Sequence, residues 1–201
     1  MFIAAPEASD ESDRIYKSSA DSHGFVMNLT RAWAWRPDVF EGFAALRAQL
    51  TSSSSLTKRE LAVIVCATAA QLGDSYCSLA WGRTLSDEAG PESAAAVISS
   101  DDGGLGTRDR ALAVWARKVV ADPNGTTASD VEALRSAGFN DRTIFEATAF
   151  IAFRVAFSTV NDALGVAPDW QLAESVPREV ADVVTFGRSV AVKTTTPAPD
   201  A

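Results

Sequence analysis

Apolar residues recur along this chain mostly at helical spacing, and the strict alternation typical of strands is scarce. The clearest case is residues 58–72, an apolar run preceded by Thr57 and containing Glu60, which together form a capping box. Gly73 ends this run, and Asp74 is a natural N-cap for a second helix over 75–89. The short connection predicts that the two helices form an antiparallel hairpin.

The same signals predict helices along most of the chain, over residues 19–35, 37–50, 91–100, 107–121, 129–137 and 141–164. The last of these is apolar nearly all round, so it should be deeply buried. The sequence therefore predicts an all-α helical bundle, with two antiparallel hairpins around a central helix, as a single domain over 21–190. Residues 1–20 are polar and acidic and are expected to be flexible, and residues 191–201 are expected to form a disordered tail.

Composition excludes several classes of function. The chain has 201 residues and a net charge of −8, so nucleic acid and anionic membrane surfaces are not expected partners. No apolar run reaches the roughly 18 residues of a membrane span, and the first residues lack a signal-peptide pattern. Two cysteines in a chain of this length fit a reducing compartment, so we expect a cytoplasmic protein without a disulfide framework.

Cys77 is the main candidate for chemistry because it lies in the first turn of the 75–89 helix. The helix dipole and free backbone N–H groups there favour a thiolate. Asp74 and Trp81 lie on the same face, at helical spacing from Cys77. A nearby carboxylate and apolar cover both disfavour the thiolate, so the sequence predicts at most a mildly activated thiol unless a cation lies beside it.

Arg154 is the best candidate for that cation, because it interrupts the apolar segment "AFIAFRVAF" of the predicted central helix. A charge in such a place needs a partner. Glu60, Asp74 or Glu146 could form a structural ion pair with it. Alternatively, Arg154 could hold an anionic substrate or stabilise a thiolate at Cys77.

Other residues have simpler interpretations. Cys66 lies in the middle of an apolar run and is expected to pack in the core. His23 is the single histidine of the chain and is interpreted as an ordinary residue near the start of the first helix. Trp33 and Trp35 face different directions on a helix, so one should pack inward while the other could meet a partner subunit.

Three stretches between about residues 25 and 170 together resemble the alkyl hydroperoxidase D and carboxymuconolactone decarboxylase superfamily. The first is the capping-box glutamate, an apolar helix ending in glycine, and a helix that opens with Tyr76 and Cys77. The second is "GFNDRTI", which has the form G-x-x-D-x-x-I at a helix start. The third is "NDALGV", with Asp169 beyond it. The resemblance implies an all-α oligomeric fold with a pocket between the 57–72 and 75–89 helices, closed by the 141–164 helix.

The resemblance also implies chemistry, but the motif departs from the family pattern. Peroxidases of this family carry Cys-x-x-Cys-x-x-x-His, in which two cysteines cycle between dithiol and disulfide while the histidine and an upstream glutamate relay protons. Here Asp74 stands at the first cysteine and Trp81 at the histidine, so only Cys77 matches. Strict spacing places the glutamate at Ala62, two residues from Glu60.

Three functions follow as hypotheses. A peroxidase-like, antioxidant oxidoreductase would use Cys77, with a peroxide substrate and an external thiol as reductant. A cofactor-independent lyase, hydrolase or isomerase would use Asp74 or Glu60 as acid or base, with Arg154 binding a carboxylate. A non-catalytic oligomeric member would bind a small molecule only. The predicted site residues are Cys77, Asp74 and Glu60 as catalytic groups and Trp81, Arg154 and Tyr76 for substrate, with no metal or cofactor, in a homo-oligomer (dimer, trimer or hexamer).

Overall fold

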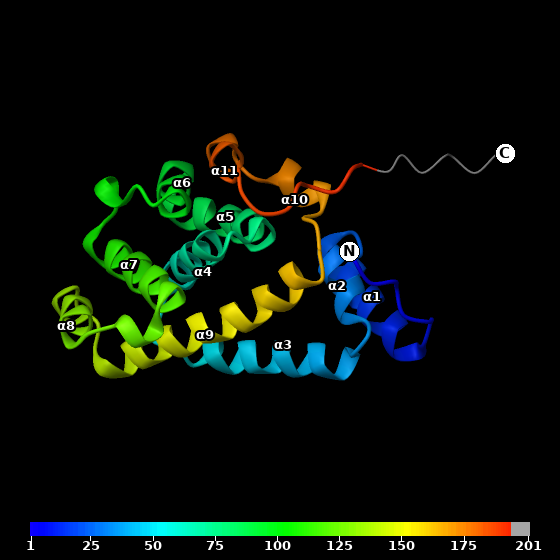
Figure 1. Cartoon of the computed structure of the whole chain (residues 1–201), viewed down its shortest axis with the longest axis horizontal. Coiled ribbons are helices and arrows are strands. Elements are labelled where there is room, and N and C mark those ends of the chain that lie inside the picture. The colour runs from blue at the N-terminus through cyan, green and yellow to red at the C-terminus, as the bar shows by residue number, and fades with distance from the viewer. Residues whose placement is uncertain (194–201) are drawn as a thin grey trace.

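The computed structural model describes residues 1–193 and confirms the all-α fold, since no strand occurs in that part of the chain. The α-helices are α1 (Asp10–His23), α2 (Asn28–Trp33), α3 (Pro37–Ser52), α4 (Lys58–Leu72), α5 (Ser75–Ala89), α6 (Pro91–Ser99), α7 (Thr107–Ala121), α8 (Ala128–Ser136), α9 (Asp141–Ala163), α10 (Trp170–Ser175) and α11 (Arg178–Val183). Two short 3₁₀ helices, Asp102–Gly104 and Pro123–Gly125, lie in the connections. Figure 1 shows α4 and α5 at the centre, α9 running beside α3, and α1 and α2 together near one end.

The predicted hairpin forms the centre of the bundle, because α4 and α5 pack closely together. The capping box is present: Thr57 accepts from the Glu60 backbone N–H, and the Glu60 carboxylate accepts from that of Thr57. Gly73 ends α4 in the left-handed conformation, at φ +74°, which glycine adopts without steric cost. Only Gly73 and Asp74 separate the helices, so α5 returns directly along α4 and carries Cys77 at its start.

The long helix α9 packs against α3, α4 and α7 and supplies many of the buried core residues. Asn140 caps it by accepting the Thr143 N–H at 2.9 Å, as predicted. By length and apolar composition alone, α9 is the one helix within residues 1–193 that could cross a membrane. Because helices cover it on several sides, we interpret it as the core helix of a soluble bundle; the cytoplasmic location stays a prediction.

The first twenty residues differ from the flexible segment expected there. Residues 10–23 form α1, which Ser9 caps reciprocally with Ser12, and three acidic residues lie in its first turn. Ile15 is only 5% exposed, so α1 packs one face on the bundle. The sparse apolar residues hid this helix, because local capping and first-turn charges stabilise it more than a wide apolar stripe does.

Several other boundaries are corrected. The helix expected over 19–35 is interrupted, because Gly24 ends α1 in the left-handed conformation and α2 begins only at Asn28. Helix α8 begins at Ala128, one residue before the predicted range, since the capping box joins Thr127 and Asp130. Helices α10 and α11 were missed because each has only six residues, too short to show a period.

The chain after α11 crosses the turn that separates α4 from α5. The Ser75 hydroxyl donates to the carbonyl of Arg188 at 2.8 Å and accepts the Arg188 N–H at 3.0 Å. Gly187 has φ +72°, and a Cβ at this position would overlap the carbonyl oxygen of Gly73. Only glycine therefore allows residues 184–190, which we call the C-terminal strap, to lie so close to the start of α5.

The tail predicted over 191–201 falls mostly outside the described residues, which end at Lys193. Within the described part, the Ala191 N–H donates to the carbonyl of Pro168 at 2.8 Å. Lys193 contacts Glu174 and the ring of Trp170. Residues 191–193 are thus fixed on α10.

Candidate functional site

A cavity of about 990 Å³ lies between α5, α9 and the N-terminal helices. Residues from α1, α2, α3, α5, α9 and α10 line it, and α4 does not. The sequence placed the pocket between α4 and α5, and the structure corrects this, because those two helices pack tightly against each other. The cavity opens instead on the other face of α5, with α9 as one wall as expected.

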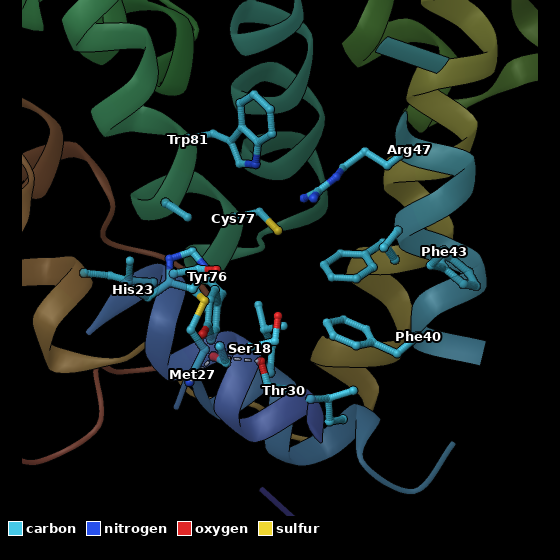
Figure 2. A pocket seen from close by; sticks show the side chains of 18 of the residues that line it. Ser18, His23, Met27, Thr30, Phe40, Phe43, Arg47, Tyr76, Cys77 and Trp81 are labelled. Atoms are coloured by element: carbon cyan, nitrogen blue, oxygen red, sulfur yellow. Dashed lines mark hydrogen bonds between the residues drawn. The ribbon is translucent and has the colours of Figure 1, made fainter. Parts of the chain in front are cut away.

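Cys77 faces this cavity from the first turn of α5 (Figure 2). Asp74 caps the helix by accepting the Cys77 backbone N–H at 2.8 Å, which fixes the turn that presents the thiol. The Cys77 sulfur accepts a hydrogen bond from Nη2 of Arg154 at 2.9 Å, and the Ser158 hydroxyl lies 3.8 Å away. Both donors come from α9, so two helices hold the sulfur.

The electrostatic balance at Cys77 is dominated by burial. Burial raises the pKa of the Cys77 thiol to about 12, while the Arg154 charge lowers it and the Asp74 carboxylate raises it. The sequence correctly identified the opposing effects of Asp74 and of a cation, but burial outweighs both. At neutral pH the thiol is therefore mostly protonated when the cavity holds no other charge.

Arg154 is buried, at 3% exposure, and its guanidinium lies against the rings of Trp81 and Phe157. Among residues 1–193 no carboxylate forms an ion pair with it, and its Nε has no hydrogen-bond partner. Its one side-chain hydrogen bond in that range goes to Cys77. An unpaired buried charge is costly, so this cation indicates a site that takes a negative charge.

The three carboxylates that the sequence offered as partners for Arg154 lie elsewhere. Glu60 pairs with Arg108 at 2.7 Å, and Glu146 pairs with Arg142 at 2.8 Å. Asp74 is fully buried beneath the start of α5, where it caps the helix. The expected ion pair between α9 and the hairpin is thus wrong.

Glu60 is not brought to Cys77. It lies at the start of α4, while Cys77 lies beside the last turn of α4, about 15 Å further along the hairpin axis at 1.5 Å per residue. Asp74 is adjacent to Cys77 in space, but it does not line the cavity. The structure therefore groups Cys77, Trp81, Arg154 and Tyr76 at one site and excludes Glu60.

Two aromatic residues predicted to bind substrate line the cavity. Trp81 is partly exposed one helical turn beyond Cys77 and forms an apolar wall. Tyr76 presents part of its ring, but its hydroxyl donates to Asp169, which also accepts the Asn28 N–H. Burial is the largest cause that raises the pKa of the Tyr76 hydroxyl, so Tyr76 holds the cavity floor rather than donating a proton.

Arg47 is a further candidate for the site that the sequence analysis did not indicate. It projects from α3 into the cavity, and Figure 2 shows its guanidinium directed toward the Cys77 sulfur. Burial and the charge of Arg154 both lower the pKa of Arg47. Phe40, Phe43 and Arg47 follow at helical spacing, so this shared face was the signal in the sequence.

The remaining candidates are placed as follows. Cys66 is fully buried, as expected for a core residue. Neither Cys66 nor Cys77 forms a disulfide within the described residues. His23 ends α1 rather than beginning a helix, and it reaches the rim of the cavity. Trp33 packs inward and donates to Asn161 at 2.8 Å, whereas Trp35 is 52% exposed.

Asp162, near the end of α9, has an unfavourable environment. Burial and the nearby Asp74 carboxylate raise its pKa to about 6, against a partly compensating Arg188. Because the pKa of Asp162 is higher in the folded state than in the unfolded state, the free energy of unfolding falls as pH rises from the unfolded-state pKa toward 6. Above pH 6 the whole loss of stability applies. Asp162→Asn should therefore stabilise the protein by about 2 kcal/mol at neutral pH.

Urea unfolding of the wild type and the variant checks this expectation. The gap in unfolding free energy should be present near about pH 7.5 and absent near about pH 2.5, where both states bind the proton. Asp87→Asn is the matched control, because it removes the same charge from an exposed position. An equal gain from both variants, or a gap that persists in acid, would contradict the assignment.

Fold and site together define a class: an all-α bundle with a thiol at a helix start facing a cavity. Solved structures with this fold include a peroxidase-related protein of the alkylhydroperoxidase AhpD core type from Ralstonia eutropha JMP134, 28% identical, with a TM-score of 0.75, covering 93% of this chain and 97% of that chain. This match confirms the resemblance of the chain to the alkyl hydroperoxidase D-like superfamily.

Two further solved structures share the fold at lower identity. A peroxidase-related protein from Silicibacter sp. TM1040 is 24% identical, covers 85% of this chain and 93% of that chain, and has a TM-score of 0.76. The debrominase Bmp8, in complex with 2,3,4-tribromopyrrole, is 13% identical, covers 92% and 96%, and has a TM-score of 0.69. No protein-family model and no curated protein matches the sequence.

Proposed function

We propose that this protein is a one-cysteine, peroxidase-like oxidoreductase in which Cys77 is the reacting group. The observation that carries the proposal is the 2.9 Å hydrogen bond from the buried, otherwise unpaired guanidinium of Arg154 to the Cys77 sulfur, beside an open cavity. A thiol that only fills space needs no cation, whereas a thiolate nucleophile gains from one. The peroxidase-related protein at 28% identity supports the same chemistry.

The proposed reaction balances without a cofactor. The Cys77 thiolate attacks the terminal oxygen of a hydroperoxide, an S–O bond forms, and the O–O bond breaks. The electron pair leaves on the alkoxide, which takes up the proton that the thiol released. Arg154 lies where negative charge passes from sulfur to the leaving oxygen, so it can stabilise the transition state.

Reduction of the sulfenic acid must come from outside the chain. Cys66 is sealed in the core and no other cysteine is present. An external thiol would condense with the sulfenic acid, releasing water and forming a mixed disulfide. A second thiol would then restore Cys77 and leave as the disulfide of the reductant.

The proposal is tested by following oxidation of Cys77 in the intact protein. A hydroperoxide is added with dimedone, which traps sulfenic acid, and peptide mass spectrometry compares Cys77 with Cys66. Because the pKa of Cys77 lies at about 12, the oxidation rate should rise about tenfold per pH unit between about pH 6 and pH 9. Dimedone on neither cysteine, or equally on both, would overturn the proposal.

The main alternative, carboxylate-based lyase chemistry, has less support. Asp74 and Glu60 do not line the cavity, so neither carboxylate faces a substrate held there. Thiol-dependent removal of halogen is a variant of the main proposal, since a protein with this fold is named a debrominase. A bromopyrrole therefore belongs on the substrate panel beside the hydroperoxides.

A further inference from the structure

The cavity beside Cys77 carries a charge opposite to that of the protein. The whole chain has a net charge of −8. The ionisable side chains that line the cavity, Cys77 and Tyr76 aside, are Arg14, Arg47, Arg83, Arg154, His23 and Glu41. The single carboxylate among them, Glu41, is already paired with Arg14. The cavity therefore holds an excess of positive charge within an acidic molecule, which would concentrate anions there.

Arg154 donates to the Cys77 sulfur, and Figure 2 shows the Arg47 guanidinium directed toward the same sulfur. Within residues 1–193 neither guanidinium forms an ion pair with a carboxylate, although twelve other Lys or Arg side chains do. The two guanidiniums are close enough that the Arg154 charge lowers the pKa of Arg47. Two like charges that face one cavity without a counterion leave a place for an anion between them.

The rest of the cavity wall indicates what the anion is attached to. Phe40, Phe43, Phe153 and Phe157 line the side formed by α3 and α9, and Trp81 lies on α5. The Phe43 ring lies 5.6 Å from Phe153 and 6.2 Å from Phe157, centroid to centroid. These rings offer a broad apolar surface next to the two guanidiniums. A ligand that satisfies both features has an anionic head and an apolar body.

We propose that Arg47 and Arg154 form an anion site beside Cys77, and that the hydroperoxide substrate carries a carboxylate head group on an aromatic or long apolar body. Planar guanidinium groups match a carboxylate by paired N–H donors. Arg47, at the more exposed side of the cavity, would hold the head group, while Arg154 also serves the sulfur. The assignment of the substrate rests on the proposed function. Binding of an anion at Arg47 and Arg154 can be tested without turnover.

Two alkylating reagents of similar size provide the test, because both form the same S–C bond at the Cys77 thiolate and release iodide. Iodoacetate carries a carboxylate, whereas iodoacetamide is neutral. Because both reagents react with the same thiolate, the ratio of their two rates does not depend on the fraction of Cys77 that is ionised. On thiols without a nearby cation the neutral reagent reacts faster. Here iodoacetate should react faster at Cys77, as measured by peptide mass spectrometry of the intact protein.

The arginine assignment is tested with Arg47→Met, compared with Arg178→Met as the control. Arg178 is exposed and pairs with Asp182, so its loss changes the net charge equally without touching the cavity. The iodoacetate to iodoacetamide ratio should fall about tenfold in Arg47→Met and stay unchanged in Arg178→Met. An equal fall in both variants, or faster reaction with iodoacetamide in the wild type, would overturn the anion site.

Protection of the thiol tests the apolar body. Phenylbutyrate should slow the reaction of Cys77 with iodoacetamide, while phenylbutanol and acetate, which carry only one of the two features, should not. Equal protection by phenylbutanol would overturn the anionic head, and equal protection by acetate would overturn the apolar body. If these results hold while peroxide leaves Cys77 unoxidised, the proposed function fails and the anion site stands.

Discussion

Replacing Cys77 with serine should reduce hydroperoxide turnover by the full protein to the uncatalysed background, a loss of about a thousandfold or more. The serine hydroxyl is a weak nucleophile at its ordinary pKa and does not form a sulfenic acid. The change is nearly isosteric, and the new oxygen can still accept from Arg154. We therefore expect the fold to be kept, and thermal unfolding checks this beside the peroxide assay with an added dithiol.

Cys66→Ala is the matched control, because it removes the other thiol from a fully buried position away from the cavity. It should lower stability, since it leaves a small void in the core, but keep turnover. Turnover retained by Cys77→Ser would refute the central role of this sulfur. Loss of turnover in Cys66→Ala, with the fold intact, would refute its assignment as a packing residue.

Replacing Arg154 with methionine should slow the reaction of Cys77 with hydroperoxide about a hundredfold at fixed pH. An adjacent opposite charge shifts a pKa by about 1–3 units, so its loss lowers the thiolate fraction by a corresponding factor. Because burial already raises the pKa of Cys77, the variant should reach a given rate only at higher pH. The pH profile of Cys77 oxidation measures this displacement.

The same substitution should not destabilise the protein. Arg154 is buried without an ion-pair partner in residues 1–193, and replacing such a charge with an apolar chain of similar length removes a desolvation cost. We therefore expect an unchanged or higher midpoint in urea unfolding, together with the slower reaction. Arg154→Lys, which keeps the charge, should retain part of the rate. A variant that loses stability and rate in proportion would indicate a structural role only.

The sequence predicted the elements that local chemistry specifies. The capping box at Thr57, the stop at Gly73 and the N-cap at Asp74 depend on near neighbours, so the α4–α5 hairpin and the position of Cys77 were predictable. Helix α9 is less buried than its apolar sequence predicted, since nine of its 23 residues are buried and Phe145 is 73% exposed. Helix α1 was not predictable in the same way, because few of its residues are apolar.

The cavity could not be read from the sequence, because residues distant along the chain assemble it. Arg47 and Arg154 come from α3 and α9, more than a hundred positions apart, and meet only after the helices pack. The sequence also offered three carboxylates for Arg154 without distinguishing them. Tertiary packing directed Glu60 and Glu146 to other arginines and left the guanidinium with the sulfur.

The C-terminal strap also constrains how the site matures during synthesis. Gly187 and Arg188 seat on the turn before α5, so the start of the helix that bears Cys77 gains its last contacts from residues translated more than a hundred positions later. While those residues remain in the ribosome tunnel, a nascent chain that already contains Cys77 lacks the contacts between the strap and the start of α5. The Cys77 thiol therefore reaches its final surroundings only after the chain through Arg188 has been synthesised.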